Sequence, residues 1–510
     1  GHAASGYARA TGKVGVCSAT SGPGATNLVT PLTDAFMDST GIVALTGQVA
    51  TPVIGRDAFQ ECDTVGITMP ITKHNVLVTD AKQLPRAVAE AFYLARTGRP
   101  GPTLVDIPRD VAQTEIDFEL PDQIAFKGYR PRYQPSMNQV MAAAQAINQA
   151  RKPILYVGGG AITSDAWREV RALAEKANLP VTVTVMGKGA FDEMHPLSLG
   201  MLGMHGTAYA NYAMHYSDLI IAVGARFDDR VTGKLAAFAP FAKVVHIDID
   251  PAEIGKNRNA DFPVQGDARQ SLALLLPHVQ RTPSDEWHQQ IAEWKQKYPL
   301  RYRQGDDVIL PQFAIDTLYQ LTRERDPYVT VDVGQHQMWA AQFVKTRIPR
   351  RFISSSGLGT MGYGVPAALG VQFGKPDDLV MAIVGDGGFQ MTVQALTTGL
   401  EFKLPLKVFI INNGFLGMVR QWQELFYSNR YSEVDLRAGN PDFAKLAEAY
   451  GCAGIRVTRP ELLESAVRQA LAVSDRPVVV DIMVSPEENV YPMIPAGTTI
   501  NDMIVEGPHK

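Results

Sequence analysis

Cysteine is scarce in this chain. Its 510 residues include three cysteines, Cys17, Cys62 and Cys452, and no two of them have the spacing of a paired motif. A disulfide framework or a cysteine-based zinc site would need such pairs, so the sequence argues against both. This composition is typical of a protein kept in a reducing compartment.

An excess of one charge and a long apolar run are also missing. The 48 basic and 52 acidic residues give a formal net charge of −4 without any basic block, so nucleic acid is not an expected partner. No apolar run reaches the roughly 18 residues that a membrane-spanning helix requires, so no membrane association is expected. Neither a signal peptide nor a transit peptide is visible, and we expect a cytoplasmic protein. A plastid location stays open, because the chain begins at Gly1 rather than at Met.

Short apolar runs alternate with helical stretches along the whole chain. Examples of such runs are residues 14–20, 41–47, 153–160, 219–225, 244–250, 379–387 and 406–413. Continuous apolar strands separated by helices predict parallel sheets that are covered on both faces. Proline-rich and polar stretches at 120–136 and 297–311 interrupt this pattern and predict linkers.

The length of the chain and these linkers predict three doubly wound α/β domains with parallel sheets. We place the three domains at residues 1–120, 135–285 and 305–485. A tail of residues 486–510 is rich in proline, glycine and polar residues, and we expect it to lie on the surface.

One stretch of the third predicted domain carries a carboxylate and an amide at two strand ends. The strand at 379–387 ends in Gly385-Asp386-Gly387, a single helix is predicted over 389–402, and the strand at 406–413 ends in Asn412-Asn413. The carboxyl ends of neighbouring parallel strands form a ligand-binding edge. Mg²⁺ combines such hard oxygen ligands with phosphate oxygens. The stretch therefore predicts a metal-bridged diphosphate cofactor, and a tight turn without a ligand is the alternative.

The spacing of GDG, 24 further residues and NN resembles the diphosphate-binding motif of thiamin-diphosphate enzymes. That resemblance implies that Asp386, Asn413 and the backbone carbonyl of Phe415 bind Mg²⁺. It also implies that Met361 supports the bent form of thiamin diphosphate. Further contacts to this cofactor are implied for Gln335, His336, Gly385, Gly387, Gly388 and Met418. Without the resemblance, His336 would be taken as a structural histidine.

Motifs along nearly the whole chain are most similar to the acetohydroxyacid synthase (acetolactate synthase) catalytic subunits of that family. They are GYARATGK (6–13), TSGPGATN (20–27), DAFQE (57–61), GRPGPTLVDIPRD (98–110), GMLGMHGT (200–207), GARFDDR (224–230), DVGQHQMW (332–339), SSGLGTMGYG (355–364) and GMVRQWQ (417–423). The resemblance implies an enzyme that decarboxylates pyruvate on thiamin diphosphate. The two-carbon unit is then joined to pyruvate or 2-oxobutyrate, in the first common step of valine, leucine and isoleucine biosynthesis.

The same resemblance implies that the first domain covers the pyrimidine of thiamin diphosphate, the middle domain binds FAD, and the last domain holds the diphosphate. The FAD contacts are implied for Arg99, Gly158, Gly159, Gly160, His205, Gly206, Thr207, Gly224, Arg226, Asp248, Ile249 and Asp267. The glycine turn at 158–160 lacks a full dinucleotide fingerprint, so the turn alone is weak evidence. A helix cap is the alternative role of Asp248.

The substrate pocket is likewise implied by resemblance. Arg226 and Trp422 match residues that select the second 2-keto acid, since a guanidinium pairs with a carboxylate and an indole offers apolar contact. Phe59, Gln60 and Lys73 match residues that line the pocket from the opposite domain. Trp422 would otherwise be a core aromatic residue, and Lys73 would otherwise be a surface lysine.

One residue that the family needs is absent from the chain. In acetohydroxyacid synthases, a glutamate that activates the pyrimidine precedes the GYARATG motif, and here it would fall before Gly1. Glu61 belongs to a different motif and is a poor substitute. We therefore expect the sequence to be incomplete at its N-terminus.

The resemblance also implies partners. We expect a homodimer or a homotetramer, because two subunits of this family together build each site, and a small regulatory subunit is a possible further partner. Two alternatives stay open: a related 2-keto-acid carboligase or oxidase, such as glyoxylate carboligase or pyruvate oxidase, and a non-catalytic cofactor-binding subunit.

Overall fold

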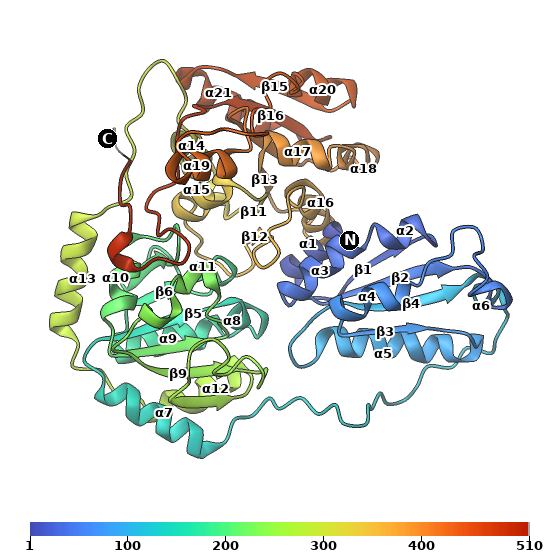
Figure 1. Ribbon diagram of the computed structural model, residues 1–510, viewed down its shortest axis with the longest axis horizontal. Coiled ribbons are helices and arrows are strands. Elements are labelled where there is room, and N and C mark those ends of the chain that lie inside the picture. Colours follow the sequence, from blue (N-terminus) through green and yellow to red (C-terminus); the bar gives the residue numbers. More distant parts are fainter. Residues whose placement is uncertain (508–510) are drawn as a thin grey trace.

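The computed structural model describes residues 1–507 and contains three parallel β-sheets with helices packed around them (Figure 1). Each sheet with its helices is called here the first, central or third domain, in chain order. This architecture confirms the predicted α/β class with three parallel sheets. None of the helices within residues 1–507 has the length and apolar character needed to cross a bilayer.

The first domain has a four-stranded sheet in the order β1-β2-β4-β3. Its strands are β1 (Gly15–Ala19), β2 (Ile42–Gln48), β3 (His74–Leu77) and β4 (Thr103–Pro108). Its helices are α1 (His2–Thr11), α2 (Pro23–Thr26), α3 (Val29–Met37), α4 (Thr64–Thr68), α5 (Leu84–Arg96) and α6 (Arg109–Gln113), with short 3₁₀ turns at η1 (Thr51–Val53), η2 (Met69–Ile71) and η3 (Ala81–Gln83). No helix or strand lies between Gln113 and Met137, where the chain crosses to the central domain (Figure 1).

The central domain has six strands in the order β10-β9-β8-β5-β6-β7. The strands are β5 (Pro153–Val157), β6 (Val181–Val183), β7 (Ser198–Met201), β8 (Leu219–Val223), β9 (Lys243–Asp248) and β10 (Phe262–Gln265). The helices are α7 (Met137–Gln149), α8 (Gly159–Thr163), α9 (Trp167–Ala177), α10 (Ala208–Tyr216), α11 (Asp229–Thr232), α12 (Ala268–Leu275) and α13 (Asp285–Lys297), with η4 (Val185–Gly187), η5 (Leu235–Ala237) and η6 (Leu276–His278). The chain order reverses between β5 and β8, which are neighbours, so a topological switch point lies there.

The third domain repeats this design with the strand order β12-β11-β13-β14-β16-β15. The strands are β11 (Tyr328–Val331), β12 (Phe352–Ser354), β13 (Val380–Gly385), β14 (Lys407–Asn412), β15 (Ala453–Val457) and β16 (Val478–Met483). The helices are α14 (Pro311–Thr322), α15 (Gln335–Phe343), α16 (Gly364–Gly374), α17 (Asp386–Met391), α18 (Ala395–Glu401), α19 (Gly417–Phe426), α20 (Phe443–Ala449) and α21 (Pro460–Ala472), with η7 (Arg323–Arg325). The last turn, η8 (Ile500–Asp502), belongs to the C-terminal segment and contacts α10 of the central domain (Figure 1). Its switch point lies between β11 and β13.

The single helix predicted over 389–402 is wrong, because the structure divides this segment into α17 and α18. The break falls at Thr392, whose backbone leaves the helical region with φ −138°. The Thr392 hydroxyl donates a hydrogen bond to the carbonyl of Gly362 at 2.9 Å. The break therefore coincides with a hydrogen bond to a residue 30 positions earlier in the chain, which the local helical pattern could not predict.

The first and third domains meet where α1 crosses α16 (Figure 1). A Cβ on Gly370 would lie 1.8 Å from the carbonyl oxygen of Ala3, and one on Gly6 would lie 2.1 Å from that of Ala367. The two helix backbones therefore touch, and each glycine is needed because no side chain fits between them.

The C-terminal segment does not lie wholly on the surface, so that expectation is wrong for part of it. Val490 and Met493 are fully buried. The Val490 amide donates to Gln421 Oε1 at 2.8 Å in the third domain, and the Ile494 amide donates to the Met204 carbonyl at 2.8 Å in the central domain. The segment thus joins two domains, which its polar composition did not indicate.

Candidate cofactor and substrate site

A cavity of about 740 Å³ lies between the central and third domains. The carboxyl ends of β11, β13 and β14 face it from the third domain, and those of β5 and β8 face it from the central domain. The predicted residues that line it are Gly158, Gly159, His205, Gly224, Arg226, Gln335, His336, Met361, Gly385, Asp386, Gly387, Gly388, Asn413, Phe415, Met418 and Trp422. Two switch points, where α/β proteins bind ligands, therefore open into one space.

Asp386 and Asn413 both line the cavity, at the ends of two neighbouring strands. They directly follow β13 and β14, which pair in parallel with Gly385 opposite Ile411. The Asp386 side chain is buried and accepts a hydrogen bond from Asn440 Nδ2 at 2.6 Å. Burial raises the pKa of Asp386 to about 6, because a charged carboxylate is poorly solvated there.

The two neighbouring asparagines have different surroundings. Asn412 is buried away from the cavity, and its Nδ2 donates to Asp481 Oδ1 at 2.8 Å. Asn413 lines the cavity, and its Nδ2 donates to Gln335 Oε1 at 3.2 Å. A Cβ on Gly417 would lie 2.2 Å from that Gln335 oxygen, so a larger residue where α19 begins would displace the Gln335 amide. Of the pair, Asn413 is the asparagine that can reach a ligand.

His336 is a buried histidine with an unpartnered nitrogen at the cavity. It lies in the first turn of α15, and its Nε2 has no hydrogen-bond partner in the part of the chain that the structure describes. Burial lowers the pKa of His336 to about 3, so the ring is neutral at pH 7. The beginning of α15 also directs backbone N–H groups toward the cavity lined by Gly334, Gln335 and His336, an arrangement suited to an anion.

The donor set at this edge fits a magnesium ion held together with phosphate. Within residues 1–507, no group of three or more His, Cys, Asp or Glu side chains could hold a metal. Asp386 supplies one carboxylate, and Asn413 and Phe415 lie beside it along the cavity. Mg²⁺ accepts such a small set of hard oxygen donors when a diphosphate supplies further oxygens.

Several residues predicted to contact FAD lie outside the cavity lining. They are Gly160, Gly206, Thr207, Asp248, Ile249 and Asp267. Thr207 caps α10 by accepting from the Ala210 amide at 3.2 Å, and Asp267 caps α12 by accepting from the Gln270 amide at 3.0 Å. Asp248 is buried and accepts from the Asp250 amide at 2.8 Å, and burial raises its pKa to about 6. Local backbone contacts thus occupy these three side chains.

The predicted residues of the first domain do not reach the cavity of their own chain. The Phe59 side chain is 90% exposed, and Gln60 follows it with a positive φ of 62°. Lys73 Nζ donates to the carbonyls of Leu94 and Thr97 at 2.5 and 2.8 Å, and burial lowers the pKa of Lys73 to about 8.

Two further charged residues of the first domain are held by protein contacts. Arg99 Nη1 forms ion pairs with Asp250 at 3.2 Å and Glu253 at 2.7 Å in the central domain, and Glu253 is at the cavity wall. Glu61 accepts hydrogen bonds from the backbone amides of Gly55 and Ala58. These contacts occupy its carboxylate, in agreement with the expectation that Glu61 is a poor substitute for the activating glutamate.

Two polar residues that form hydrogen bonds in or beside this site were not predicted from the sequence. Asn440 contacts Asp386 from a loop 54 residues further along the chain, and no sequence signal points to it. Asp332 directly follows the buried strand β11 and accepts from the amides of Gly362 and Gly364 at 3.0 and 2.8 Å. An aspartate at the end of an apolar strand was a signal that could have been used for Asp332.

Comparison with known proteins places all three domains in one family. Residues 1–67 match the thiamine pyrophosphate enzyme N-terminal TPP binding domain, residues 140–275 the central domain, and residues 332–482 the C-terminal TPP binding domain. The chain is 52% identical to the acetolactate synthase large subunit of Corynebacterium glutamicum over 512 residues, which cover 99% of the chain and 82% of that protein. It is 50% identical to the acetolactate synthase of Arthrospira platensis, over 99% of the chain and 88% of that protein. It is 48% identical to the acetolactate synthase large subunit of Cyanidium caldarium, over 99% and 87%.

Proposed function

The chain belongs to the thiamine pyrophosphate enzyme family, and on that premise we propose that it is an acetolactate synthase catalytic subunit. It would decarboxylate one pyruvate and join the two-carbon unit to a second pyruvate or to 2-oxobutyrate. The observation that carries this proposal is the meeting of Asp386, Asn413 and His336 at one sheet edge, in a chain so similar to acetolactate synthases. That similarity favours this activity over the related carboligases and oxidases.

The third domain would hold the diphosphate and Mg²⁺. Asp386, the Asn413 amide oxygen and the Phe415 carbonyl would bind the metal, and Gln335 and His336 would bind the diphosphate. The neutral His336 ring has an unpartnered Nε2, which as an N–H would donate to a phosphate oxygen. When bound, thiamin diphosphate supplies a carbon nucleophile for the keto group of pyruvate and stabilises the negative charge that remains after CO₂ leaves.

Met361 would support the bent form of the cofactor from the cavity wall. Its terminal methyl lies 3.6 Å from the place of a Cβ on Gly387, so its thioether packs beside the Gly385–Gly388 turn. A flexible apolar side chain can fill an irregular space without adding a polar group that competes for the ligand. Gly385, Gly387, Gly388 and Met418 would complete the contacts.

The central domain would bind FAD at its own switch point. Gly158 follows β5 and Gly224 follows β8, and both lie on the cavity with His205 and Arg226. The predicted contacts outside the cavity lining (Gly160, Gly206, Thr207, Asp248, Ile249 and Asp267) are on the same domain, and Arg99 would approach from the first domain. For Arg99 this requires exchange of its ion pairs to Asp250 and Glu253.

Arg226 and Trp422 would bind the second 2-keto acid. They approach the cavity from the central and third domains, so a substrate between them would have its carboxylate near a guanidinium and its alkyl group near an indole. Discrimination by one methylene in such a pocket is worth roughly 1–3 kcal/mol.

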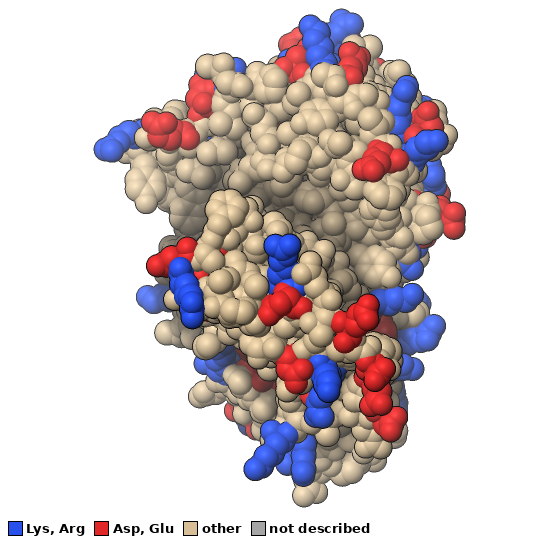
Figure 2. Space-filling model, turned by 90° about the vertical axis from the view of Figure 1, so that its right-hand side faces the viewer, with Lys and Arg blue, Asp and Glu red and all other residues tan. Residues whose placement is uncertain are grey.

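A second copy of the chain would complete the site with Phe59, Gln60 and Lys73. The first domain exposes apolar side chains at Val16, Phe36, Val53, Phe59, Ile67 and Met69. Figure 2 shows a face whose upper part has few charged side chains and a hollow, while lysines, arginines and acidic residues are spread over its lower half and along its rim. Exposed apolar surface of this kind is a mark of a protein interface. We infer a homodimer at least, and the large-subunit relatives suggest a small regulatory subunit as a further partner.

Acetolactate formation tests the proposal. Pyruvate, thiamin diphosphate, Mg²⁺ and FAD are supplied to the 510-residue chain and to a version extended upstream of Gly1. Asp386→Ala should lower activity at least about 100-fold by removing the only carboxylate of the predicted metal site. Asp377→Ala, at an exposed aspartate of the same domain, is the matched control and should keep full activity.

The outcomes separate the proposal from its alternatives. CO₂ release without acetolactate would favour a related 2-keto-acid enzyme. Cofactor binding without any turnover by either version would favour a non-catalytic subunit. Full activity of Asp386→Ala would contradict the assigned metal site.

A further inference from the structure

The loop that carries Met361 is a wall of the cavity without regular secondary structure. We call residues 355–363 the Met361 loop; it lies between β12 and α16. Ser355, Ser356, Gly357, Leu358, Gly359 and Met361 all line the cavity. Because no strand or helix fixes this wall, its position depends on the contacts made from outside the loop.

Asp38, at the end of α3 in the first domain, holds the loop by its backbone. One carboxylate oxygen accepts from the Ser356 amide at 3.0 Å, and the other accepts from the Gly357 amide at 2.7 Å. Asp38 is buried, and its partner Arg9 lies 3.5 Å away while donating to the Ser354 carbonyl at 2.5 Å. Both oxygens of this carboxylate are therefore engaged by two consecutive N–H groups.

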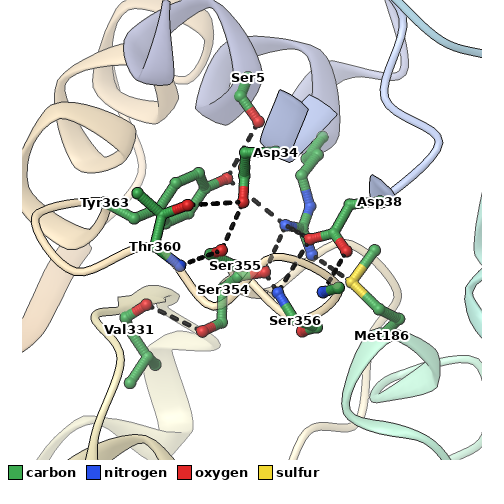
Figure 3. Close-up of polar contacts among 12 residues, drawn as sticks. Ser5, Asp34, Asp38, Met186, Val331, Ser354, Ser355, Ser356, Thr360 and Tyr363 are labelled. Carbon is green, nitrogen blue, oxygen red and sulfur yellow. Dashed lines mark hydrogen bonds and ion pairs between the residues drawn. The ribbon is translucent and has the colours of Figure 1, made fainter. Parts of the chain in front are cut away.

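Asp34 lies one turn earlier on α3 and contacts side chains of the Met361 loop (Figure 3). Its Oδ1 accepts from the Ser355 hydroxyl and from the Thr360 hydroxyl, the latter at 3.4 Å. The Thr360 amide in turn donates to Ser355 Oγ at 2.8 Å. Asp34 is fully buried, and its Oδ2 has no hydrogen-bond partner among residues 1–507. This carboxylate thus ties the two arms of the loop together through one oxygen.

The other end of the loop is fixed within the third domain. Asp332 accepts from the Gly362 amide, and Thr392 donates to the Gly362 carbonyl. Across the junction, Arg9 also donates to Met186 Sδ of the central domain at 3.1 Å, so three domains meet at this network (Figure 3). The Ser355–Thr360 part of the loop therefore depends on α3 of the first domain, which also places Met37 on the cavity wall.

We propose that Asp34 and Asp38 are positioning residues, through which the first domain of a chain sets the place of the Met361 loop in that same chain. They do not touch the cavity themselves, and they act on it through the backbone and hydroxyl groups of the loop. The consequence for cofactor binding rests on the proposed function, whereas the ordering of the loop does not.

An asparagine can keep the hydrogen bonds that Asp34 accepts, but it cannot keep both of those that Asp38 accepts. Asparagine at position 38 offers one acceptor and turns an NH₂ group toward an amide N–H, so Asp38→Asn should release one of the two backbone contacts. Asparagine at position 34 can keep the acceptor at Oδ1 and place its NH₂ where Oδ2 has no partner. Asp34→Asn is therefore the conservative replacement, and Asp34→Ala is its disruptive counterpart.

Amide hydrogen exchange of the cofactor-free chain tests the ordering of the loop. In Asp38→Asn, exchange at Ser356 and Gly357 should be at least about tenfold faster than in the wild type, and in Asp34→Asn it should stay within about twofold. If Asp38→Asn does not fold, Asp34→Ala against Asp34→Asn makes the same comparison through the Thr360 amide, which donates to the Ser355 hydroxyl that Asp34 holds. Unchanged protection in the disruptive variants would overturn the proposal.

Binding of thiamin diphosphate in the presence of Mg²⁺ tests the consequence for the site. Trp339 and Trp422 line the cavity, so their fluorescence reports binding without any turnover. We expect the Kd of Asp38→Asn to rise about tenfold and that of Asp34→Asn to stay near the wild type. Faster loop exchange in a protein whose wild type makes no acetolactate would contradict the proposed function alone. Unchanged exchange in an active enzyme would contradict the positioning role alone.

Discussion

His205 shows how one buried side chain can make the whole structure sensitive to pH. Its Nδ1 faces the Pro492 carbonyl at 3.3 Å, where the central domain meets the C-terminal segment, and its Nε2 has no hydrogen-bond partner among the described residues. Burial lowers the pKa of His205 to about 4, so the folded protein keeps a neutral ring that the unfolded chain would protonate near pH 6. The stabilisation that the neutral ring gives to the folded state is therefore complete above pH 6.5 and is lost as the pH falls toward 4.

Replacing His205 should therefore flatten the pH profile of stability. In the FAD-free His205→Gln variant, the loss of unfolding free energy between pH 7 and pH 5 should be smaller than in the wild type by about 2 kcal/mol. Thermal unfolding at a series of pH values measures this difference. His278→Gln, at an exposed histidine, is the control and should follow the wild type. Parallel profiles of His205→Gln and the wild type would show that the ring does not titrate in this range.

At the scale of elements, helix propensity and tertiary packing favour different residues at the crossing of α1 and α16. Alanine is the better helix former, so propensity alone would make Gly370→Ala stabilising by about 1 kcal/mol. The new Cβ would lie 1.8 Å from the Ala3 carbonyl oxygen, which is backbone and cannot rotate away. Overpacking of this kind costs about 1–3 kcal/mol, so the clash should win.

Gly370→Ala should consequently lower the melting temperature and separate the first domain from the third. Limited proteolysis should cleave near α1 faster than in the wild type. Gly305→Ala is the matched control, because a Cβ there meets nothing within 4 Å. A melting temperature of Gly370→Ala at or above that of the control would mean that the two helices can move apart at no cost.

At the scale of the whole molecule, a buried ion pair holds the central domain on the third. Lys188 Nζ donates to both oxygens of Glu193 at 2.8 and 2.6 Å and to the Ala341 carbonyl at 3.0 Å. Glu193 also accepts from the Thr346 amide at 2.6 Å. Lys188 is fully buried, and burial lowers its pKa, so its charge depends on the partner carboxylate. The pair belongs to the central domain, and its contacts to the Ala341 carbonyl and the Thr346 amide connect it to the third domain.

Removing one partner should cost more than removing both charges. Lys188→Met leaves a buried carboxylate without its cation and should destabilise the protein by about 3–5 kcal/mol. Adding Glu193→Gln neutralises that carboxylate and keeps an acceptor for Thr346, so the double variant should regain more than half of the loss. A thermodynamic cycle of the two single variants and the double variant measures the coupling. A double variant no more stable than Lys188→Met would contradict the ion-pair explanation.

The α/β class, the parallel sheets and the placement of Asp386 and Asn413 at the ends of neighbouring strands could be predicted from the amino-acid pattern alone. These follow from apolar periodicity and from the rule that parallel strands end at one edge, which are local properties of the chain. Other features could be seen only in the folded protein: the break at Thr392, the burial of Val490 and Met493, the contact of Asn440 with Asp386, and the hydrogen bonds of Asp34 and Asp38 to the Met361 loop. Each of these joins residues far apart in the chain, and no local pattern of side chains records which distant backbone group will satisfy a buried polar atom.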